Sequence, residues 1–573
     1  MNKKWRVSEK DASKFASEHN QYHPLIAQLL YNRGLQSQQE VDLFFNPDYQ
    51  KLHDPCLFKD MGVAVERIWQ AIEKQEKILI HGDYDADGVT SASVLFKTLS
   101  ILQADVEVFI PHRELDGYGL NMENVQKFID RKIKLLITVD CGITNVKEID
   151  FLNKNKVDVI VTDHHQPLEI LPAAIALLDP KVVDAGYPFK ELSGAGVAYK
   201  LVQALLHDPK IERFESELSE YGGRSGFLKW LLDIVAIGTI ADIVPLIDEN
   251  RILVKWGLTV LGKTKNFGLQ KLLNIISNKK IDTYTIGYQL APRLNAAGRI
   301  KHAEAAFELL TTADLGKAEQ LADDLQKNNL QRQKLTELAV QEVKSLIDAT
   351  QDNKIFFAYK KEWEPGIIGL IAGKLADELY RPVIIMTESN GRIVGSGRSI
   401  EEFNITNGLV TVSDLLARFG GHSQACGFTL ARMELLDDFK SQLTKYANES
   451  LKDLTLSPCL DIDAEINFSL TTWDFINQLN QFEPYGEGNE KPKFLLKNLQ
   501  IVAVDYLGDK EQHIRMMVKQ GDNPSLRKLI GFGLTNGWRH LAPGDIIEAV
   551  VEIGVNEWNG NRDIECRIID LKK

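Results

Sequence analysis

The sequence has few cysteines, no long uninterrupted apolar run and no excess of positive charge. Its five cysteines are scattered along 573 residues without a C-x-x-C pair, which argues against a disulfide scaffold or a zinc ribbon and fits a reducing cytoplasm. The longest apolar stretch, Leu231 to Ile247, is broken by Asp233 and Asp242, and the N-terminus lacks the apolar core of a secretion signal. We therefore expect a cytoplasmic protein without membrane spans.

The net charge of −13 excludes a protein that binds polyanions over its whole surface. Between Lys491 and Arg539, however, nine lysines and arginines outnumber four acidic residues, so a nucleic-acid site is expected to be local. The chain length predicts three or four domains, and 44% hydrophobic with 26% charged residues is typical of a globular protein.

One stretch, KILIHGDYDADGVTSASVL from Lys77 to Leu95, combines three signals. An apolar β-type run is followed by one imidazole and three carboxylates within seven residues, and helical spacing begins directly afterwards. Because like charges repel and resist burial, such a group at a strand tip calls for a cation. The alternatives are a divalent-metal site and a solvated acidic loop. The polar residues are His81, Asp83, Asp85 and Asp87.

Apolar β-type runs recur through the first half of the chain, and helical patterns at 89–102 and 122–131 separate the first three. This alternation predicts an α/β unit with a mostly parallel sheet, in which functional groups gather beyond the carboxyl ends of the strands. The predicted strands are Lys77–Ile80, Asp105–Ile110, Lys134–Val139, Val157–Thr162 and Ile175–Leu178.

The ends of these runs carry the same kinds of side chain. The third run ends in Asp140, the fourth in Asp163-His164-His165, and a further apolar stretch, Ile234–Ile237, leads to Asp242. Taken singly, Asp163-His164-His165 also fits a turn and Asp242 a helix cap. Taken together, these segments predict that four strand tips converge on one site.

Oxygen-rich ligation with one or two imidazoles favours Mn²⁺ or Mg²⁺ over a soft metal. About six candidate ligands exceed what one octahedral ion with bound waters takes. We therefore expect two ions that share a bridging carboxylate, an arrangement suited to the hydrolysis of phosphoesters.

The ordered segments HGDYDADG, VDCG, TDHH and GTIADIVP resemble the DHH phosphoesterase superfamily, in which a parallel-sheet domain precedes a smaller DHH-associated domain. The resemblance implies a ligand set: His81 and Asp85 for one ion, Asp87, His164 and Asp242 for the other, and Asp140 as the bridge. It also implies that His165 faces the substrate phosphate as a donor, that Asp163 orients this loop, and that Asp83 supports the ligands without binding an ion itself.

Four further segments offer a basic side chain, and three of them place it beside small residues, as a phosphate-binding surface requires. In each, the resemblance favours substrate binding, although GSGRS alone is equally a hairpin turn and Arg113 alone equally a surface ion pair. The candidates are Arg113 in PHRELDGYGLN, Arg293, Asn295 and Arg299 in APRLNAAGR, Ser396 and Arg398 in GSGRS, and His422 in FGGH.

We predict five segments along the chain. Residues 1–50 form an N-terminal segment, 51–302 the DHH domain, 303–350 a long connecting helix, 351–454 a smaller α/β DHH-associated domain, and 455–573 an all-β barrel of the OB type. The barrel has aromatic and basic side chains for single strands, among them Tyr506, Trp558, Arg515, Lys519, Arg527 and Lys528. For the connecting helix a coiled coil is the alternative, but no heptad is sustained.

Over residues 50–573 the chain is similar to the RecJ-type single-stranded-DNA-specific exonucleases. The resemblance implies 5′-to-3′ hydrolysis to mononucleotides with Mn²⁺ or Mg²⁺ in recombination and repair, the strand running between the two α/β domains. It further implies that Arg113, Ser396 and Arg398 hold the 5′-phosphate, and that a single-strand-binding protein and a helicase are partners. The alternatives are a short-oligonucleotide or dinucleotide phosphodiesterase and an inactive replication scaffold; since all six ligand candidates are present, the scaffold is disfavoured.

Overall fold

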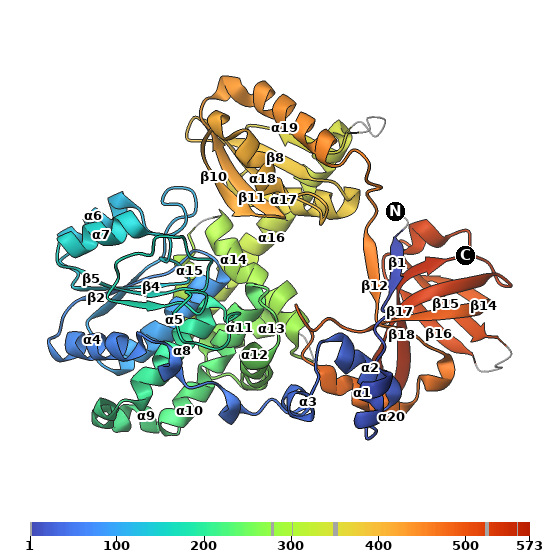
Figure 1. Cartoon of the computed structure of the whole chain (residues 1–573), viewed down its shortest axis with the longest axis horizontal. Helices are drawn as coiled ribbons and strands as arrows, with labels where there is room; N and C mark the ends of the chain where they lie inside the picture. Colours follow the sequence, from blue (N-terminus) through green and yellow to red (C-terminus); the bar gives the residue numbers. More distant parts are fainter. Residues whose placement is uncertain (1–2, 277–279, 301, 348–352, 522–525, 559) are drawn as a thin grey trace. The chain divides into compact units, whose positions relative to one another are not determined.

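A computed structural model describes residues 3–276, 280–300, 302–347, 353–521, 526–558 and 560–573 (Figure 1). The chain forms two compact units. Unit 1 comprises Met1–Lys51, Pro245–Arg251 and Ser457–Lys573, and unit 2 comprises Leu52–Val244 and Ile252–Leu456. Among the described residues, none of the helices combines the length and the apolarity needed to cross a bilayer.

A five-stranded parallel sheet lies at the centre of the first part of unit 2, with strand order β3-β2-β4-β5-β6. All five runs predicted between Lys77 and Leu178 are strands, so the predicted α/β fold is confirmed. Strands β2 and β4 are buried along their whole length because they lie inside the sheet and are almost entirely apolar. The strands are β2 Ile78–His81, β3 Val106–Phe109, β4 Leu135–Val139, β5 Asp158–Thr162 and β6 Ala176–Leu178.

Helices cover both faces of this sheet (Figure 1). Helices α6 (Met122–Asp130) and α7 (Val146–Lys154) bury Phe128 and Ile149 against Leu79 and Leu136. The other face packs against α4 (Met61–Glu73), α5 (Ala86–Ile101) and α8 (Gly194–His207). The two layers fix the carboxyl ends of the strands at one edge.

One predicted strand tip is wrong. The apolar stretch Ile234–Ile237 lies inside helix α11 (Leu232–Ala241), and Asp242 is the residue that caps the C-terminus of this helix. Helix α11 packs against α5 and α8 and is buried on almost every side, so its sequence is apolar throughout. A short, wholly apolar run does not distinguish a buried strand from a buried helix.

The predicted connecting helix is two helices, α15 (Glu304–Thr311) and α16 (Leu315–Leu346). Thr312 is extended, and the Asp314 side chain accepts a hydrogen bond from the Lys317 N–H, so α16 begins with its own N-cap.

The remainder of unit 2 is a second α/β layer with strand order β10-β11-β9-β8-β7. GSGRS is not a turn: it ends strand β9, which pairs with β8 and β11, and FGGH ends strand β10. Helices α17 (Pro365–Leu379) and α19 (Leu436–Ser450) pack on the sheet. The strands are β7 Phe356–Tyr359, β8 Val383–Ser389, β9 Arg392–Arg398, β10 Leu416–His422 and β11 Ala425–Leu430.

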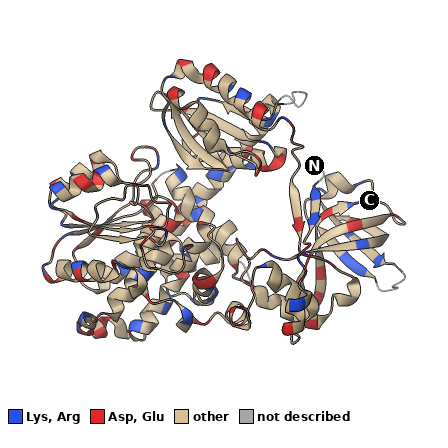
Figure 2. Ribbon diagram, in the orientation of Figure 1, with Lys and Arg blue, Asp and Glu red and all other residues tan. Residues whose placement is uncertain are grey.

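Unit 1 contains the predicted OB-like barrel. Its sheet runs β13-β14-β15-β16-β18-β17, and the additional pairing of β14 with β17 closes it. Lysines and arginines lie along β15 and β16 (Figure 2), among them Arg515, Lys519, Arg527 and Lys528; the Trp558 side chain is outside the described residues. The strands are β13 Ala464–Glu465, β14 Lys493–Leu507, β15 His513–Gln520, β16 Arg527–Gly531, β17 Ile546–Trp558 and β18 Asn561–Lys572.

The prediction of an all-β C-terminal section is only partly right, because helix α20 (Trp473–Leu479) lies within it. The predicted strand at 460–466 is split, and its first part, β12 (Cys459–Ile462), pairs in parallel with β1 (Lys4–Val7) outside the barrel. The N-terminal helices α1 (Ser13–Glu18), α2 (Pro24–Asn32) and α3 (Gln38–Phe45) share the apolar core of the barrel. The N-terminal segment is therefore part of the barrel unit.

Candidate metal centre and active site

The loop after β2 folds into a tight turn at the N-terminus of α5. The Asp85 carboxylate caps the helix by accepting hydrogen bonds from the N–H groups of Asp87 (2.9 Å) and Gly88 (3.1 Å). A Cβ at position 88 would lie 2.6 Å from the main chain of Asp83, so only glycine fits there. The motif DYDADG thus brings three aspartates to the carboxyl edge of the sheet.

Asp140 follows β4 in the left-handed region, with φ of 61°. Two residues later, Gly142 has φ of 113°, and a Cβ there would meet Thr138 Oγ1 at 2.4 Å. The Asp140 N–H donates to the Thr162 carbonyl at 3.0 Å, which anchors this turn to the neighbouring strand. The chain therefore turns sharply and keeps the Asp140 carboxylate at the sheet edge.

The Asp163 carboxylate organises the turn after β5. It accepts hydrogen bonds from the Ile143 N–H (2.9 Å), the His164 N–H (2.7 Å) and the His165 N–H (3.1 Å), and it contacts His165 Nδ1 at 2.8 Å. It is completely buried. Among the described residues, no hydrogen bond uses the other imidazole nitrogen of His165, Nε2, which can therefore face a substrate.

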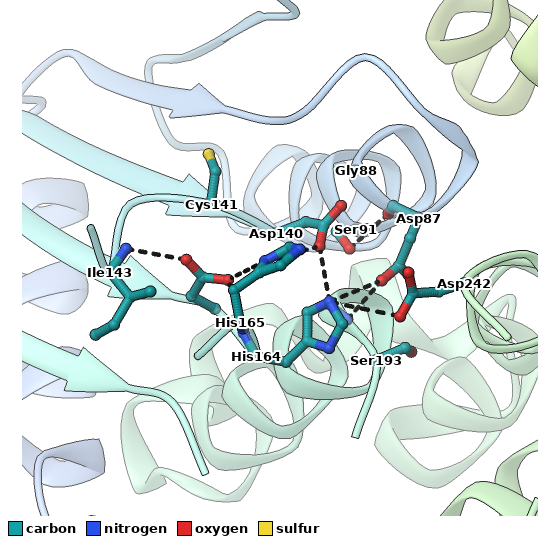
Figure 3. Close-up of polar contacts among 12 residues, drawn as sticks. Asp87, Gly88, Ser91, Asp140, Cys141, Ile143, His164, His165, Ser193 and Asp242 are labelled. Carbon is teal, nitrogen blue, oxygen red and sulfur yellow. Dashed lines mark hydrogen bonds and ion pairs between the residues drawn. The ribbon is translucent and has the colours of Figure 1, made fainter. Parts of the chain in front are cut away.

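His164 lies at the centre of a cluster of carboxylates that come from separate elements (Figure 3). Its Nε2 is 3.1 Å from Asp140 Oδ1, 3.5 Å from Asp242 Oδ2 and 3.8 Å from Asp87 Oδ2. Ligand atoms of Asp87, His164 and Asp242 all lie within 4.8 Å of one another. The same limit holds for a second group, Asp83, Asp85 and Asp140. Asp140 therefore lies beside both groups.

His81 is placed differently from the other candidates. Its buried ring packs 5.5 Å from the Phe109 ring and 6.0 Å from the Phe128 ring, and its Nδ1 is 3.6 Å from Cys141 Sγ. Within the described part of the chain, no group of converging ligand atoms includes it, whereas Asp83 belongs to one. The sequence carries one signal for this placement. Residues two apart in a strand point to the same face of the sheet, so His81 is expected on the face of Leu79, which packs with Phe128.

The metal-free cluster is electrostatically unfavourable. Burial, followed by the charge of Asp85, raises the pKa of Asp83 to about 8 and that of Asp87 to about 7. Burial, followed by the charge of Asp87, raises the pKa values of Asp140 and Asp242 well above the usual range. Burial also lowers the pKa of His164 to about 3, so its imidazole is a neutral ligand. These oxygen-rich groups with one neutral imidazole fit a hard divalent cation.

His165 has the opposite electrostatic character. Burial alone would lower its pKa, but the hydrogen bond and the charge of Asp163 raise it to about 9. The Tyr118 hydroxyl, which the sequence did not single out, lies 3.0 Å from His165 Nδ1 and 3.3 Å from the Asp140 carbonyl. In the metal-free protein at neutral pH, His165 is therefore a cation beside the carboxylate cluster.

Several arginines of unit 2 interact electrostatically with Arg299. Burial, followed by the charges of Arg113, Arg332 and Arg398, lowers the pKa of Arg299 to about 9. The Arg113 guanidinium lies 4.1 Å from the centroid of the Tyr84 ring. No sequence pattern singles out Arg332, which lies on α16 among polar residues. Such a group of like charges suits a polyanion.

The other predicted substrate residues fall into two sets. Arg398 Nη1 donates to Ser396 Oγ at 3.1 Å. Asn295 Oδ1 accepts from the Ala86 N–H at 2.8 Å, which joins α14 (Ala291–Ile300) to the loop that carries Asp83 and Asp85. Arg293 instead donates to Gln326 and to the Gln289 carbonyl. His422 is exposed at the end of β10 and, within the described ranges, joins neither the metal groups nor the arginines.

Family models match three parts of the chain: the DHH family N-terminal domain at 77–239, the DHHA1 domain at 352–449 and the RecJ OB domain at 462–570. These matches coincide with the parallel-sheet domain, the second α/β layer and the barrel.

Curated relatives extend the similarity to nearly the whole chain. The single-stranded-DNA-specific exonuclease RecJ of Bacillus subtilis is 37% identical over 99% of this chain and 70% of its own length. RecJ of Haemophilus influenzae is 30% identical over 95% of this chain and 96% of its own length.

Solved structures agree with these matches. The crystal structure of RecJ from Thermus thermophilus in complex with Mn²⁺ has a TM-score of 0.83 and 30% identity, covering 100% of this chain and 79% of that one. The Mg²⁺ complex has a TM-score of 0.77 and 28% identity, covering 100% and 78%. From its sequence relatives, its three matched domains and its fold, this chain belongs to the RecJ family of single-stranded-DNA-specific exonucleases.

Proposed function

We propose that the protein is a single-strand-specific DNA exonuclease that hydrolyses DNA from the 5′ end and releases mononucleotides. The observation that carries this proposal is the convergence of Asp87, Asp140, His164 and Asp242 from four separate strand or helix ends. Recombination and repair in the cytoplasm, with a single-strand-binding protein and a helicase as partners, complete the proposal. The predicted boundaries 51–302, 303–350, 351–454 and 455–573 stand as proposed domain limits.

Two Mn²⁺ or Mg²⁺ ions would be held by the clustered side chains. Asp87, His164 and Asp242 would bind one ion, and Asp85 with His81 the other, with Asp140 bridging them; Asp83 is the second candidate for the place of His81. Bound there, two such ions would lower the pKa of a water molecule and stabilise negative charge on the phosphate.

The protein's own groups would orient the phosphate. Asp163 engages Nδ1 of the His165 cation, so His165 Nε2 would donate a hydrogen bond to a non-bridging phosphate oxygen. Arg113, Ser396 and Arg398 would bind the 5′-terminal phosphate and so set the polarity, while Arg293, Asn295, Arg299 and His422 would contact the strand. The lowered pKa of Arg299 supports this assignment for three of the arginines, because the charges of Arg113 and Arg398 contribute to that shift.

Digestion of three substrates at equal Mn²⁺ tests the function: a long single strand, the same strand in a duplex, and a dinucleotide. We expect release of mononucleotides from the 5′ end of a long labelled single strand and little cleavage of the same strand in a duplex. If the enzyme cleaves a dinucleotide but leaves the long strand intact, it is a small-substrate phosphodiesterase instead. The relatives named above are exonucleases, so similarity to them does not favour that alternative.

Replacing Arg398 by Ala should weaken substrate binding. Loss of a charge-assisted phosphate contact is expected to raise KM for a 5′-phosphorylated strand by roughly 10- to 100-fold, with a smaller effect on kcat. Arg392→Ala is the matched control, because Arg392 is an exposed arginine on the same strand β9. An unchanged KM combined with a large loss of kcat would contradict the binding role.

A further inference from the structure

Two tyrosines of unit 2 are exposed and stacked on each other. Tyr284 is 58% exposed and Tyr288 is 73% exposed. Their ring centroids are 4.8 Å apart with an angle of 22° between the ring planes. Neither hydroxyl has a hydrogen-bond partner among the residues that the structure describes. The pair therefore presents aromatic surface that the fold itself does not use.

The pair lies on the helix that continues into the substrate segment. Tyr288 lies in the π-helix η4 (Thr285–Leu290), and α14 follows without a break. Through Asn295, α14 contacts the first residue of α5, directly after Asp85. π-helical turns are rare and often mark functional positions.

Accessibility follows one stripe along this helix. Tyr284, Tyr288, Pro292, Asn295 and Arg299 are at least partly accessible, and their spacing of four, four, three and four residues is that of one helical side. The residues on the opposite side are buried, namely Ile286, Leu290, Leu294 and Ala297. The tyrosines therefore continue the side that carries two of the predicted substrate residues, Asn295 and Arg299.

Exposed aromatic rings beside cations are suited to single-stranded nucleic acid, because every base offers a π-face for stacking whatever its sequence. At the α-helical rise of 1.5 Å per residue, which is an upper bound for the π-helical turn, Tyr288 lies at most roughly 10 Å along the helix from Asn295, and Tyr284 at most roughly 17 Å. This separation corresponds to bases a few nucleotides away from the reacting phosphate.

We propose that Tyr284 and Tyr288 form a stacking platform for the bases of the single strand, downstream of the 5′-terminal nucleotide. The proposal rests on the exonuclease function proposed above and adds a binding site to it. The platform holds the strand without reading its sequence and acts only on substrates longer than a dinucleotide.

The experiment compares the double variant Tyr284→Ala/Tyr288→Ala with Tyr284→Phe/Tyr288→Phe. Leu338→Ala, which removes a 54% exposed apolar side chain from α16, is the control. We expect the alanine pair to raise KM for a 5′-phosphorylated 20-nucleotide oligo(dT) by roughly 10-fold or more. The phenylalanine pair, the control and the KM for the dinucleotide pdTpdT should stay near wild type.

A second substrate makes the test independent of fold stability. A strand with abasic residues at its third to fifth positions should bind the wild type more weakly than the intact strand, and this penalty should disappear in the alanine pair. An unchanged KM, a penalty that persists in the alanine pair, or equal losses in the alanine and phenylalanine pairs would each overturn the platform.

The failure of the platform can be distinguished from the failure of the proposed function. If the wild type cleaves only the dinucleotide, the exonuclease proposal itself falls. If the alanine pair changes only the sedimentation of the protein and not KM, the tyrosines serve contact with a second copy, and the platform is wrong.

Discussion

Replacing Asp140 should lower kcat by more than about 100-fold, because loss of a group that merely supports a metal ligand already costs up to that much. Asp140 lies 3.1 Å from His164 Nε2 and belongs to the group formed with Asp83 and Asp85. A single substitution therefore removes an oxygen from both proposed ion positions. The measurement is single-turnover release of mononucleotide from a 5′-labelled strand, with the bound metal counted in parallel.

The choice of substitution matters because Asp140 has φ of 61°. Alanine is strained in this left-handed region, whereas asparagine tolerates it, so Asp140→Asn tests the carboxylate with the least disturbance of the turn. Asp105→Asn is the control, since Asp105 is exposed directly before β3, at the amino end of the sheet. Turnover near the wild-type rate in both Asp140→Ala and Asp140→Asn would contradict the bridging role.

Lowering the pH from 8 to 6 should weaken Mn²⁺ binding by roughly 100-fold, because the carboxylates must lose protons before they can bind the ion. In the metal-free protein, burial raises the pKa of Asp83 to about 8 and that of Asp87 to about 7. Both groups are largely protonated at pH 6, and both are at least half ionised at pH 8. Affinity is therefore expected to rise with pH across this window.

Calorimetric titration with Mn²⁺ in buffers of different ionisation enthalpy measures both the affinity and the protons released. We expect more than one proton per protein to be released at pH 6.5, and fewer for Asp83→Asn. An affinity that does not change between pH 6 and 8, with no proton release, would show that the ion does not displace protons from these carboxylates.

The parallel sheet and most of the site were predictable because the signals are local. Each buried strand is a compact apolar run, and Asp140 and Asp163 come directly after such runs, so topology alone brings them to one edge. The same reasoning wrongly predicted a strand before Asp242. The segment is helix α11, which is buried on almost every side and so lacks the alternation of apolar and polar residues that usually marks a helix. The site prediction survived this error because a helix end also delivers a side chain to the edge.

Other features depend on packing that no local pattern encodes. His81 and Asp83 lie two residues apart, but the structure directs His81 towards Phe109 and Phe128 and Asp83 into a group with Asp85 and Asp140. Similarly, β1 is a four-residue strand whose partner, β12, lies more than 450 residues later in the chain. Arg332 has no distinguishing pattern in the sequence, and only the fold brings its charge close enough to Arg299 to lower the pKa of that arginine.

Anomalous diffraction from crystals soaked in Mn²⁺ tests the metal centre most directly. We expect two peaks, one among Asp87, His164 and Asp242 and one beside Asp85, with the Asp140 carboxylate within bonding distance of both. The absence of an ordered ion at these residues, or a single ion that does not touch Asp140, would contradict the two-metal exonuclease.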